Sequence, residues 1–359
     1  MNTRPFLVAI VAVALVVALA IAAVLYLAPR MLPGFADPPA ALGRTLPSLA
    51  GASGWIGSDS LSADALRGHP SLLLVWTDTD PRSLDALRVA ESWHRAFAPL
   101  GCRIVAVHAP DFAFASDRAV PERIAQSLGL TLPLALDATL QLQSALGGAT
   151  DGPHLIVADG AGRVVLDTVG ALAAAEQALR TVYGPLPTGT ALPPLIAESA
   201  PVAVRTVYLG TGRVTGGPLK GMAAGSEHTF TTQFRYQEQG RVETPYPVGR
   251  WRVGADGVLA LRAGAAHLVA IRYSAARVGV VVSPPSNGTG RLWLLLGERW
   301  PCAEECEADV AFDGRGAAFV EVTEPRLYWL EHGTGERVLR LSPGDAGLTI
   351  HAFVFEDAR

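Results

Sequence analysis

The chain has 359 residues, of which 50% are hydrophobic and 17% are charged, and its formal net charge is −4. This length suits two or three domains, and the hydrophobic fraction excludes a chain that is disordered over most of its length. The small negative charge gives no reason to expect nucleic-acid binding, which depends on a strongly basic face.

The first predicted element is a membrane-spanning helix within residues 1–28. Residues 6–28 contain no charged side chain. A helix of that length extends for about 34 Å, and the hydrocarbon core of a bilayer is about 30 Å thick. Ala20-Ile21-Ala22 also resembles a signal-peptide cleavage site, so a cleaved signal peptide is the alternative. We favour a retained anchor, because the apolar segment of a signal peptide is usually only ~7–15 residues long.

Small side chains recur on one face of this predicted helix. Ala14, Ala18 and Ala22 are spaced four residues apart. This spacing allows a second transmembrane helix to approach closely and pack against the first. We therefore treat these alanines as a candidate packing face for a partner's helix, with the general abundance of alanine in the chain as the simpler explanation.

Two proline-rich segments divide the remainder of the chain. Residues 29–45 and 185–200 lack a helical or strand period and are expected to be linkers. The region between them, 46–184, alternates strand-like and helix-like segments. The last region, 201–359, contains many short strand-like segments separated by glycine-rich turns. The sequence therefore predicts an α/β domain followed by an all-β domain.

The elements expected in the α/β domain follow the order strand, helix, strand, helix, strand, strand, helix. Short apolar segments are typical of strands buried on both faces, and the helix-like segments place apolar residues near helical spacing. The last two strands are joined at Asp159-Gly160, a turn sequence of hairpins. We expect the elements at residues 71–76, 83–101, 102–110, 120–130, 133–137, 153–170 and 171–184. This order is that of a thioredoxin-like core.

Four segments of this domain carry a resemblance to a known family. They are ADALRGHPSLLLVWT, IVAVHAPDFAFA, LGLTLPLALD and GPHLIVADGAGRVV, and they lie within residues 60–184. In the same order they resemble the extracytoplasmic thioredoxin-like region of DipZ-type cytochrome c biogenesis proteins. In that family a strand ending in Trp-Thr is followed two residues later by Cys-x-x-Cys at the start of a helix. Trp76 and Thr77 are present here.

The resemblance implies where the redox motif would lie. Its two cysteine positions fall on Asp80 and Ser83, with Pro81 and Arg82 between them, and the family's cis-proline corresponds to Pro153. Thiol–disulfide exchange needs one thiolate that attacks and a second thiol that resolves the mixed disulfide. We therefore expect a thioredoxin-like domain that has lost its redox chemistry, with Asp80 capping the helix.

Other chemistry in this domain has less support. Cys102 begins a predicted strand, so we expect a buried and inert thiol; a one-cysteine peroxidase is the alternative, with only Arg103 beside the thiol. Asp78 and Asp80 supply too few oxygen ligands for calcium and are explained by capping or solvation. We expect no metal and no cofactor, and we assign no histidine a ligand role.

Residues 201–359 are predicted to form an antiparallel β-sandwich. The segments GRWRVG, VTEPRLYWL and LTIHAFVFE resemble the C-terminal domain of the DipZ-type proteins, which is a jelly roll similar to carbohydrate-binding modules. That family begins with a polytopic membrane domain that carries electrons. This chain has a single predicted helix in its place, so no built-in electron supply is evident.

Two sets of side chains in this domain are candidates for specific roles. Sugar binding needs exposed aromatic rings, whereas aromatic residues on alternating strands more often fill the core. The aromatic candidates are Trp251, Trp293, Trp300, Tyr328 and Trp329. Cys302 and Cys306 flank a short turn, and we expect them to form a local disulfide in an oxidising compartment.

These features predict a non-enzymatic protein of the bacterial inner membrane, with one transmembrane helix and most of the chain in the periplasm. Its expected role is that of a structural or assembly subunit in a larger membrane complex of respiratory, photosynthetic or cytochrome-assembly type. The partner would contact the helix and the periplasmic domains. Two alternatives remain: a thiol–disulfide oxidoreductase or peroxidase that uses Cys102, and a glycan-binding or cell-wall-binding module formed by residues 201–359.

Overall fold

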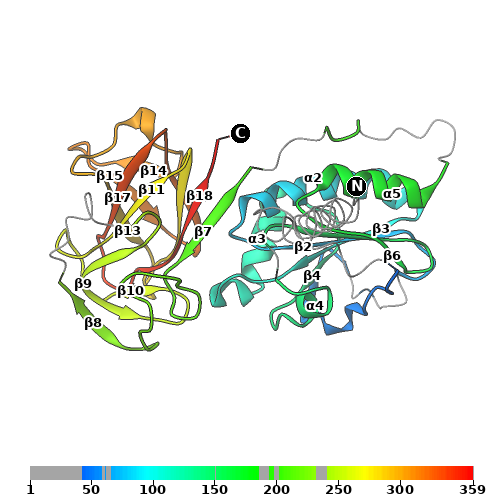
Figure 1. The fold of residues 1–359 in the computed structure, drawn as a ribbon, viewed down its shortest axis with the longest axis horizontal. Coiled ribbons are helices and arrows are strands. Elements are labelled where there is room, and N and C mark those ends of the chain that lie inside the picture. The colour runs from blue at the N-terminus through cyan, green and yellow to red at the C-terminus, as the bar shows by residue number, and fades with distance from the viewer. Residues whose placement is uncertain are drawn as a thin grey trace, which may run out of the picture. The chain divides into compact units, whose positions relative to one another are not determined.

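The computed structural model describes residues 43–58, 61, 66–149, 151–185, 194–197, 202–231 and 241–358. In this part of the chain, no helix combines the length and the apolar character needed to cross a membrane. The expected anchor, with its candidate face of Ala14, Ala18 and Ala22, lies outside the described residues, as does most of each expected linker. The described residues form an α/β domain and a large all-β region (Figure 1).

The α/β domain is built on a six-stranded sheet in the order β1-β4-β3-β2-β5-β6. The strands are β1 Gly54–Ile56, β2 Ser71–Trp76, β3 Arg103–His108, β4 Leu134–Leu136, β5 His154–Ala158 and β6 Val164–Val169. β2, β3 and β4 are parallel, whereas β1, β5 and β6 are antiparallel to the strands beside them. β2 and β5 are buried along their whole length. The expected thioredoxin-like α/β fold is confirmed.

Helices cover both faces of this sheet. They are α2 Pro81–Phe97, α3 Ala119–Leu128, α4 Gln141–Ala145 and α5 Leu172–Tyr183. α2 and α5 lie on one face and α4 lies on the other (Figure 1). Trp93 and Phe97 of α2 are buried against the first face. α2 begins two residues before the expected start, because Asp80 caps it and Pro81 suits its first turn.

Twelve strands are described in the all-β region. They are β7 Val204–Tyr208, β8 Glu227–Phe230, β9 Tyr246–Val253, β10 Val258–Ala260, β11 Leu268–Ser274, β12 Arg277–Ser283, β13 Gly290–Leu296, β14 Val310–Phe312, β15 Ala318–Val322, β16 Arg326–His332, β17 Glu336–Pro343 and β18 Thr349–Glu356. One antiparallel sheet contains β8, β9, β10, β18, β12 and β16, with β7 also paired to β18. The other contains β14, β15, β13, β17, β11 and β9.

Strand β9 belongs to both sheets and bends between them. Its residues 246–248 pair with β11, and its residues 249–253 pair with β8 and β10. Gly249 has a φ of 86°, and a Cβ at this position would collide with the ring of His267. Glycine is therefore required where the strand changes sheet. The two sheets enclose one core, while the jelly-roll connectivity implied by the resemblance stays a prediction.

One carboxylate is buried between the two sheets. Glu331 of β16 is 0% exposed, and it accepts hydrogen bonds from the Tyr273 hydroxyl and, at 2.7 Å, from the Arg337 guanidinium. Tyr273 and Arg337 lie on β11 and β17 of the opposite sheet. Burial disfavours the charged carboxylate more than Arg337 favours it, and this raises the pKa of Glu331 to about 7. The Glu331 carboxyl group, which connects the two sheets, therefore titrates near neutral pH.

We expect Glu331→Gln to remove a pH dependence of the free energy of unfolding. The ordinary pKa of 4.5 is raised to about 7 in the folded protein, so the stability that Glu331 contributes is complete below pH 4.5 and is lost as the pH rises through 7. The difference in unfolding free energy between wild type and variant should fall by on the order of 2 kcal/mol over this interval. Urea titrations at several pH values measure this difference, and a constant value would contradict the raised pKa.

Candidate functional site

The position of the expected redox motif is occupied by a helix cap and a buried hydroxyl. Asp80 precedes α2, and its carboxylate accepts a hydrogen bond from the backbone N–H of Arg82 at 2.9 Å. Ser83 is 1% exposed, and its hydroxyl oxygen accepts a hydrogen bond from the N–H of Thr77 at 3.3 Å. Neither side chain can form a disulfide. The residues that stand at the two implied cysteine positions therefore support the helix start and cannot exchange electrons.

Arg82 connects the start of α2 to the loop before Pro153. Its guanidinium donates to Asp80 at 3.0 Å and to Asp151 at 2.7 Å. Burial works against the charged guanidinium, but the hydrogen bonds and charges of these two carboxylates outweigh that effect and raise the pKa of Arg82. The Arg82 guanidinium is thus shared by two carboxylates next to the start of α2.

The cis-proline that the resemblance implies at Pro153 is not present. Pro153 lies beside this loop, but the Gly152–Pro153 bond is trans, as are all peptide bonds among the described residues. Gly152 has a φ of 120°, and the guanidinium carbon of Arg82 lies 3.3 Å from where a Cβ would stand. The chain therefore turns at a glycine packed against Arg82 before it reaches Pro153.

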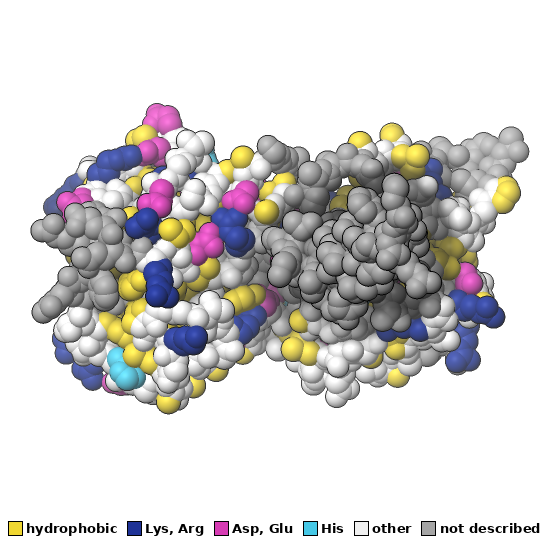
Figure 2. Space-filling model, viewed as in Figure 1, with side chains coloured by type: hydrophobic (Ala, Val, Ile, Leu, Met, Phe, Trp, Pro, Cys, Tyr) yellow, Lys and Arg dark blue, Asp and Glu magenta, His cyan; other side chains and the backbone are white. Residues whose placement is uncertain are grey.

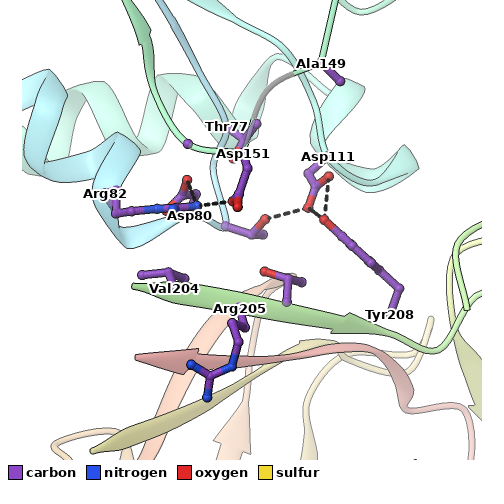
Figure 3. A pocket seen from close by; sticks show the side chains of 12 residues that line it. Thr77, Asp80, Arg82, Asp111, Ala149, Asp151, Val204, Arg205 and Tyr208 are labelled. Atoms are coloured by element: carbon purple, nitrogen blue, oxygen red, sulfur yellow. Dashed lines mark hydrogen bonds and ion pairs between the residues drawn. The ribbon is translucent and has the colours of Figure 1, made fainter. Parts of the chain in front are cut away.

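A cavity of about 460 Å³ lies between this motif and strand β7. Its lining residues are Thr77, Thr79, Asp80, Arg82, Asp111, Ala149, Asp151, Gly152, Val204, Arg205, Thr206 and Tyr208. In Figure 3 the carboxylates of Asp80, Asp111 and Asp151 lie on the side of the α/β domain, and Val204 faces them from β7. The Arg205 side chain extends to the opposite side of β7, where Glu243 and Asp357 bind it. The implied redox position thus faces a strand of the all-β region.

The cavity is bounded by an interaction that joins the α/β domain to the all-β region, which we name the Asp111 clasp (Asp111, Tyr208 and Arg213). Arg213 donates to the Asp111 carboxylate at 2.5 Å and to the Asp111 carbonyl oxygen at 2.6 Å. The Tyr208 hydroxyl donates to the same carboxylate at 3.3 Å, and the Arg213 guanidinium carbon lies 3.7 Å from the centroid of the Tyr208 ring. Burial and the adjacent Asp111 raise the pKa of Tyr208 to about 12, so it remains a donor at neutral pH.

Phe112 adds an apolar contact beside the clasp. It is 3% exposed and packs with Val281, Ala352 and Val354 on the outer face of the sheet that contains β12 and β18. Its ring also lies 5.3 Å from the ring of His351. Because this cluster is buried and the clasp beside it is half-buried, the α/β domain and the sheet pack against each other. The position of β7 opposite the motif is therefore fixed by packing.

Asp78 and His108 form a buried polar pair that the sequence analysis did not predict. Asp78 and His108 are each 2% exposed in their side chains, and their closest nitrogen and oxygen lie 3.5 Å apart. His108 also packs against Trp76, with ring centroids 4.6 Å apart. Asp80 acts as the expected cap, whereas the expectation that Asp78 is a cap or solvated is wrong. The signal was the end of two adjacent parallel strands: His108 is the last residue of β3 and pairs with Trp76 of β2, and Asp78 follows β2 by two residues.

The three cysteines do not form a redox pair. Cys102 is 1% exposed, and burial raises its pKa to about 12. Cys302 and Cys306 are free, which corrects the expected local disulfide. The reason is local: Cys302 caps the short helix at 303–305 and directs its sulfur toward the carboxylate of Glu305, 3.2 Å away.

The five aromatic candidates for sugar binding divide into three groups. Trp251 and Tyr328 are buried in the core between the sheets. Trp329 packs at the edge of the Phe112 cluster, which we define as Phe112 with Val281, Ala352 and Val354. Trp293 and Trp300 remain at the surface of the sheet that contains β13. Their ring centroids are 6.1 Å apart, and Trp300 is 42% exposed. Among the described residues, no group of three or more histidine, cysteine or acidic side chains is arranged to hold a metal ion.

Comparison with known proteins finds a family match in the all-β region and relatives that align with a larger part of the chain. Residues 205–355 match the family model "Thioredoxin like C-terminal domain". Over 268 residues the chain is 25% identical to Protein DipZ of Mycobacterium bovis and to Protein DipZ of Mycobacterium tuberculosis, covering 70% of this chain and 36% of each relative. The chain thus spans little more than a third of the length of these relatives.

Solved structures with a similar fold include thiol–disulfide proteins. A putative thiol:disulfide interchange protein DsbE from Chlorobium tepidum is 16% identical, with a TM-score of 0.34, and the match covers 40% of this chain and 98% of that one. A thiol-disulfide isomerase from Corynebacterium glutamicum is 18% identical, with a TM-score of 0.30, and the match covers 36% and 86% of the two chains. The strand order of the α/β domain is the independent basis of the thioredoxin-like fold.

Proposed function

We propose that this chain is a non-catalytic, single-pass protein of the bacterial inner membrane. Its periplasmic domains would serve as a structural or assembly subunit of a larger respiratory, photosynthetic or cytochrome-assembly complex. One observation carries the proposal: Asp80 caps α2, and the Ser83 hydroxyl is buried and hydrogen-bonded, where a thioredoxin-like enzyme needs two thiols.

The fixed interface supports a binding role rather than a catalytic one. The Asp111 clasp and the Phe112 cluster place β7 across the cavity from the motif. A redox enzyme needs an accessible thiolate at that position, whereas a binding protein needs a rigid surface. Figure 2 shows acidic and basic side chains interspersed over the all-β region on the visible face. Such a mixed surface suits a protein partner better than a polyanion, which favours a field of one sign.

We expect the wild-type protein to show no thiol–disulfide exchange in an insulin-reduction assay with dithiothreitol. Cys102→Ser should match wild type, because a buried thiol with a pKa of about 12 carries almost no thiolate at neutral pH. The matched positive variant is Asp80→Cys with Ser83→Cys, which should gain a reversible disulfide, detected as the loss and return of two titratable thiols.

This assay separates the proposed function from its enzymatic alternative. Insulin reduction or peroxide consumption by wild type that disappears in Cys102→Ser would overturn the non-catalytic proposal. The double-cysteine variant shows that the assay detects a redox pair at this position.

We also expect the protein to comigrate with other membrane proteins after mild detergent extraction and native electrophoresis, well above its own mass of 37.6 kDa. Ala18→Leu should reduce comigration, because Ala18 belongs to the candidate packing face. Ala20→Leu is the matched control, since on a helix it lies about 200° around the axis from Ala18. Migration of the native extract as a lone monomer would contradict the role as a subunit.

Glycan binding is the second candidate function, favoured by one observation. Trp300 is 42% exposed and packs edge-on against Trp293, so an aromatic surface remains open on the all-β region. A ligand that stacks there should change tryptophan fluorescence in wild type and not in Trp300→Ala. Titration with soluble cell-wall glycans that leaves the fluorescence unchanged would remove this candidate.

A further inference from the structure

Strand β7 presents an unpaired edge next to the cavity. It pairs only with β18 among the described strands. The backbone N–H of Leu209 donates to the carbonyl oxygen of His351 at 2.9 Å. The backbone N–H of Asp357 donates to the carbonyl oxygen of Ala203 at 3.0 Å. This register directs the backbone groups of alternate residues, Val204 and Thr206, away from β18. Within the described part of the chain, no hydrogen bond uses these outward groups.

The cavity lies on the same face of β7 as the side chains of Val204 and Thr206. Both residues line it, and Val204 lies across from Asp151 in Figure 3. A strand added beside β7 would place alternate side chains on this face, because side chains in a sheet alternate between its two faces. The volume of about 460 Å³ is within the range of roughly 300–1,000 Å³ that ligand sites occupy. The edge can therefore supply backbone pairing, and the cavity can supply a side-chain pocket.

The charges around the cavity favour a cation. The Arg82 guanidinium is shared by Asp80 and Asp151, so these three groups carry a surplus negative charge. The Asp151 side chain is 88% exposed and faces the cavity (Figure 3). On the other side of β7, Arg205 is likewise shared by two carboxylates. A basic side chain entering here would meet uncompensated carboxylate charge.

We infer that the edge of β7 pairs with an extended segment of a partner protein and that the cavity receives a lysine or arginine side chain of that segment. This inference rests on the proposed function, because it gives the chemistry of the partner for the same site. The backbone of β7 provides affinity and the carboxylates select the basic side chain.

The test uses the detergent-solubilised full chain and a fluorescent heptapeptide of alternating threonine and valine with a central arginine. Its control is the same peptide with a central glutamate. Fluorescence anisotropy should show the arginine peptide binding at least about tenfold more tightly than the glutamate peptide. The difference should shrink at high salt, since exposed charges are screened.

Two variants separate the backbone contribution from the charge contribution. Thr206→Pro removes an outward N–H without removing a hydrogen bond to β18, and should weaken binding of the arginine peptide by about tenfold or more. Asp151→Asn should weaken it severalfold and narrow the preference for arginine. Asp85→Asn on α2 is the matched control, because Asp85 is also exposed, at 63%, and should bind like wild type.

Hydrogen exchange gives a measurement that does not depend on the proline variant. The arginine peptide should slow amide exchange at Val204 and Thr206 in the wild-type protein. Equal affinity for both peptides, no binding of either, or unchanged exchange at these amides would overturn the inference. None of these results would restore redox activity or remove a comigrating complex, so failure here is distinguishable from failure of the proposed function.

Discussion

Asp111 holds the loop after β3 against the all-β region, and the arrangement of the site depends on that contact. Its carboxylate and carbonyl oxygen both accept hydrogen bonds from Arg213, while Tyr208 donates to the carboxylate and stacks beneath the guanidinium. The Asp111 and Arg213 side chains are half-buried, 18% and 35% exposed, and the Tyr208 hydroxyl gives the carboxylate a further hydrogen-bond donor. The adjacent Phe112 packs on the outer face of the sheet and adds an apolar contact beside the clasp.

The start of α2 keeps its helix cap, although Asp80 and Ser83 stand where the resemblance implies two cysteines. A helix N-terminus favours negative charge, and the Asp80 carboxylate satisfies it as a thiolate would. Ser83 keeps a small polar atom in the buried position and uses it to hold the N–H of Thr77. Arg82 then joins Asp80 to Asp151, so the substituted motif takes part in a charge network on the cavity wall.

Local features were predictable from the sequence, and contacts distant along the chain were not. The order of the α/β elements follows from short apolar segments separated by helical periods, and the cap at Asp80 follows from its place before Pro81. The disulfide expected of Cys302 is not formed; its thiol instead donates a hydrogen bond to the carboxylate of Glu305, three residues later. The Asp111 clasp had no signal, since Asp111 and Arg213 are 102 residues apart and arginine is abundant throughout the chain. Packing alone brings them together.

The Phe112 cluster has a consequence for how the chain is made. Val281, Ala352 and Val354 form an apolar surface that is fully covered in the folded protein, and two of these three residues come from β18, the last strand in sequence order. Synthesis proceeds from the N-terminus, so the loop that carries Phe112 exists before this surface is complete. The α/β domain can then cover this apolar surface as soon as β18 completes the sheet.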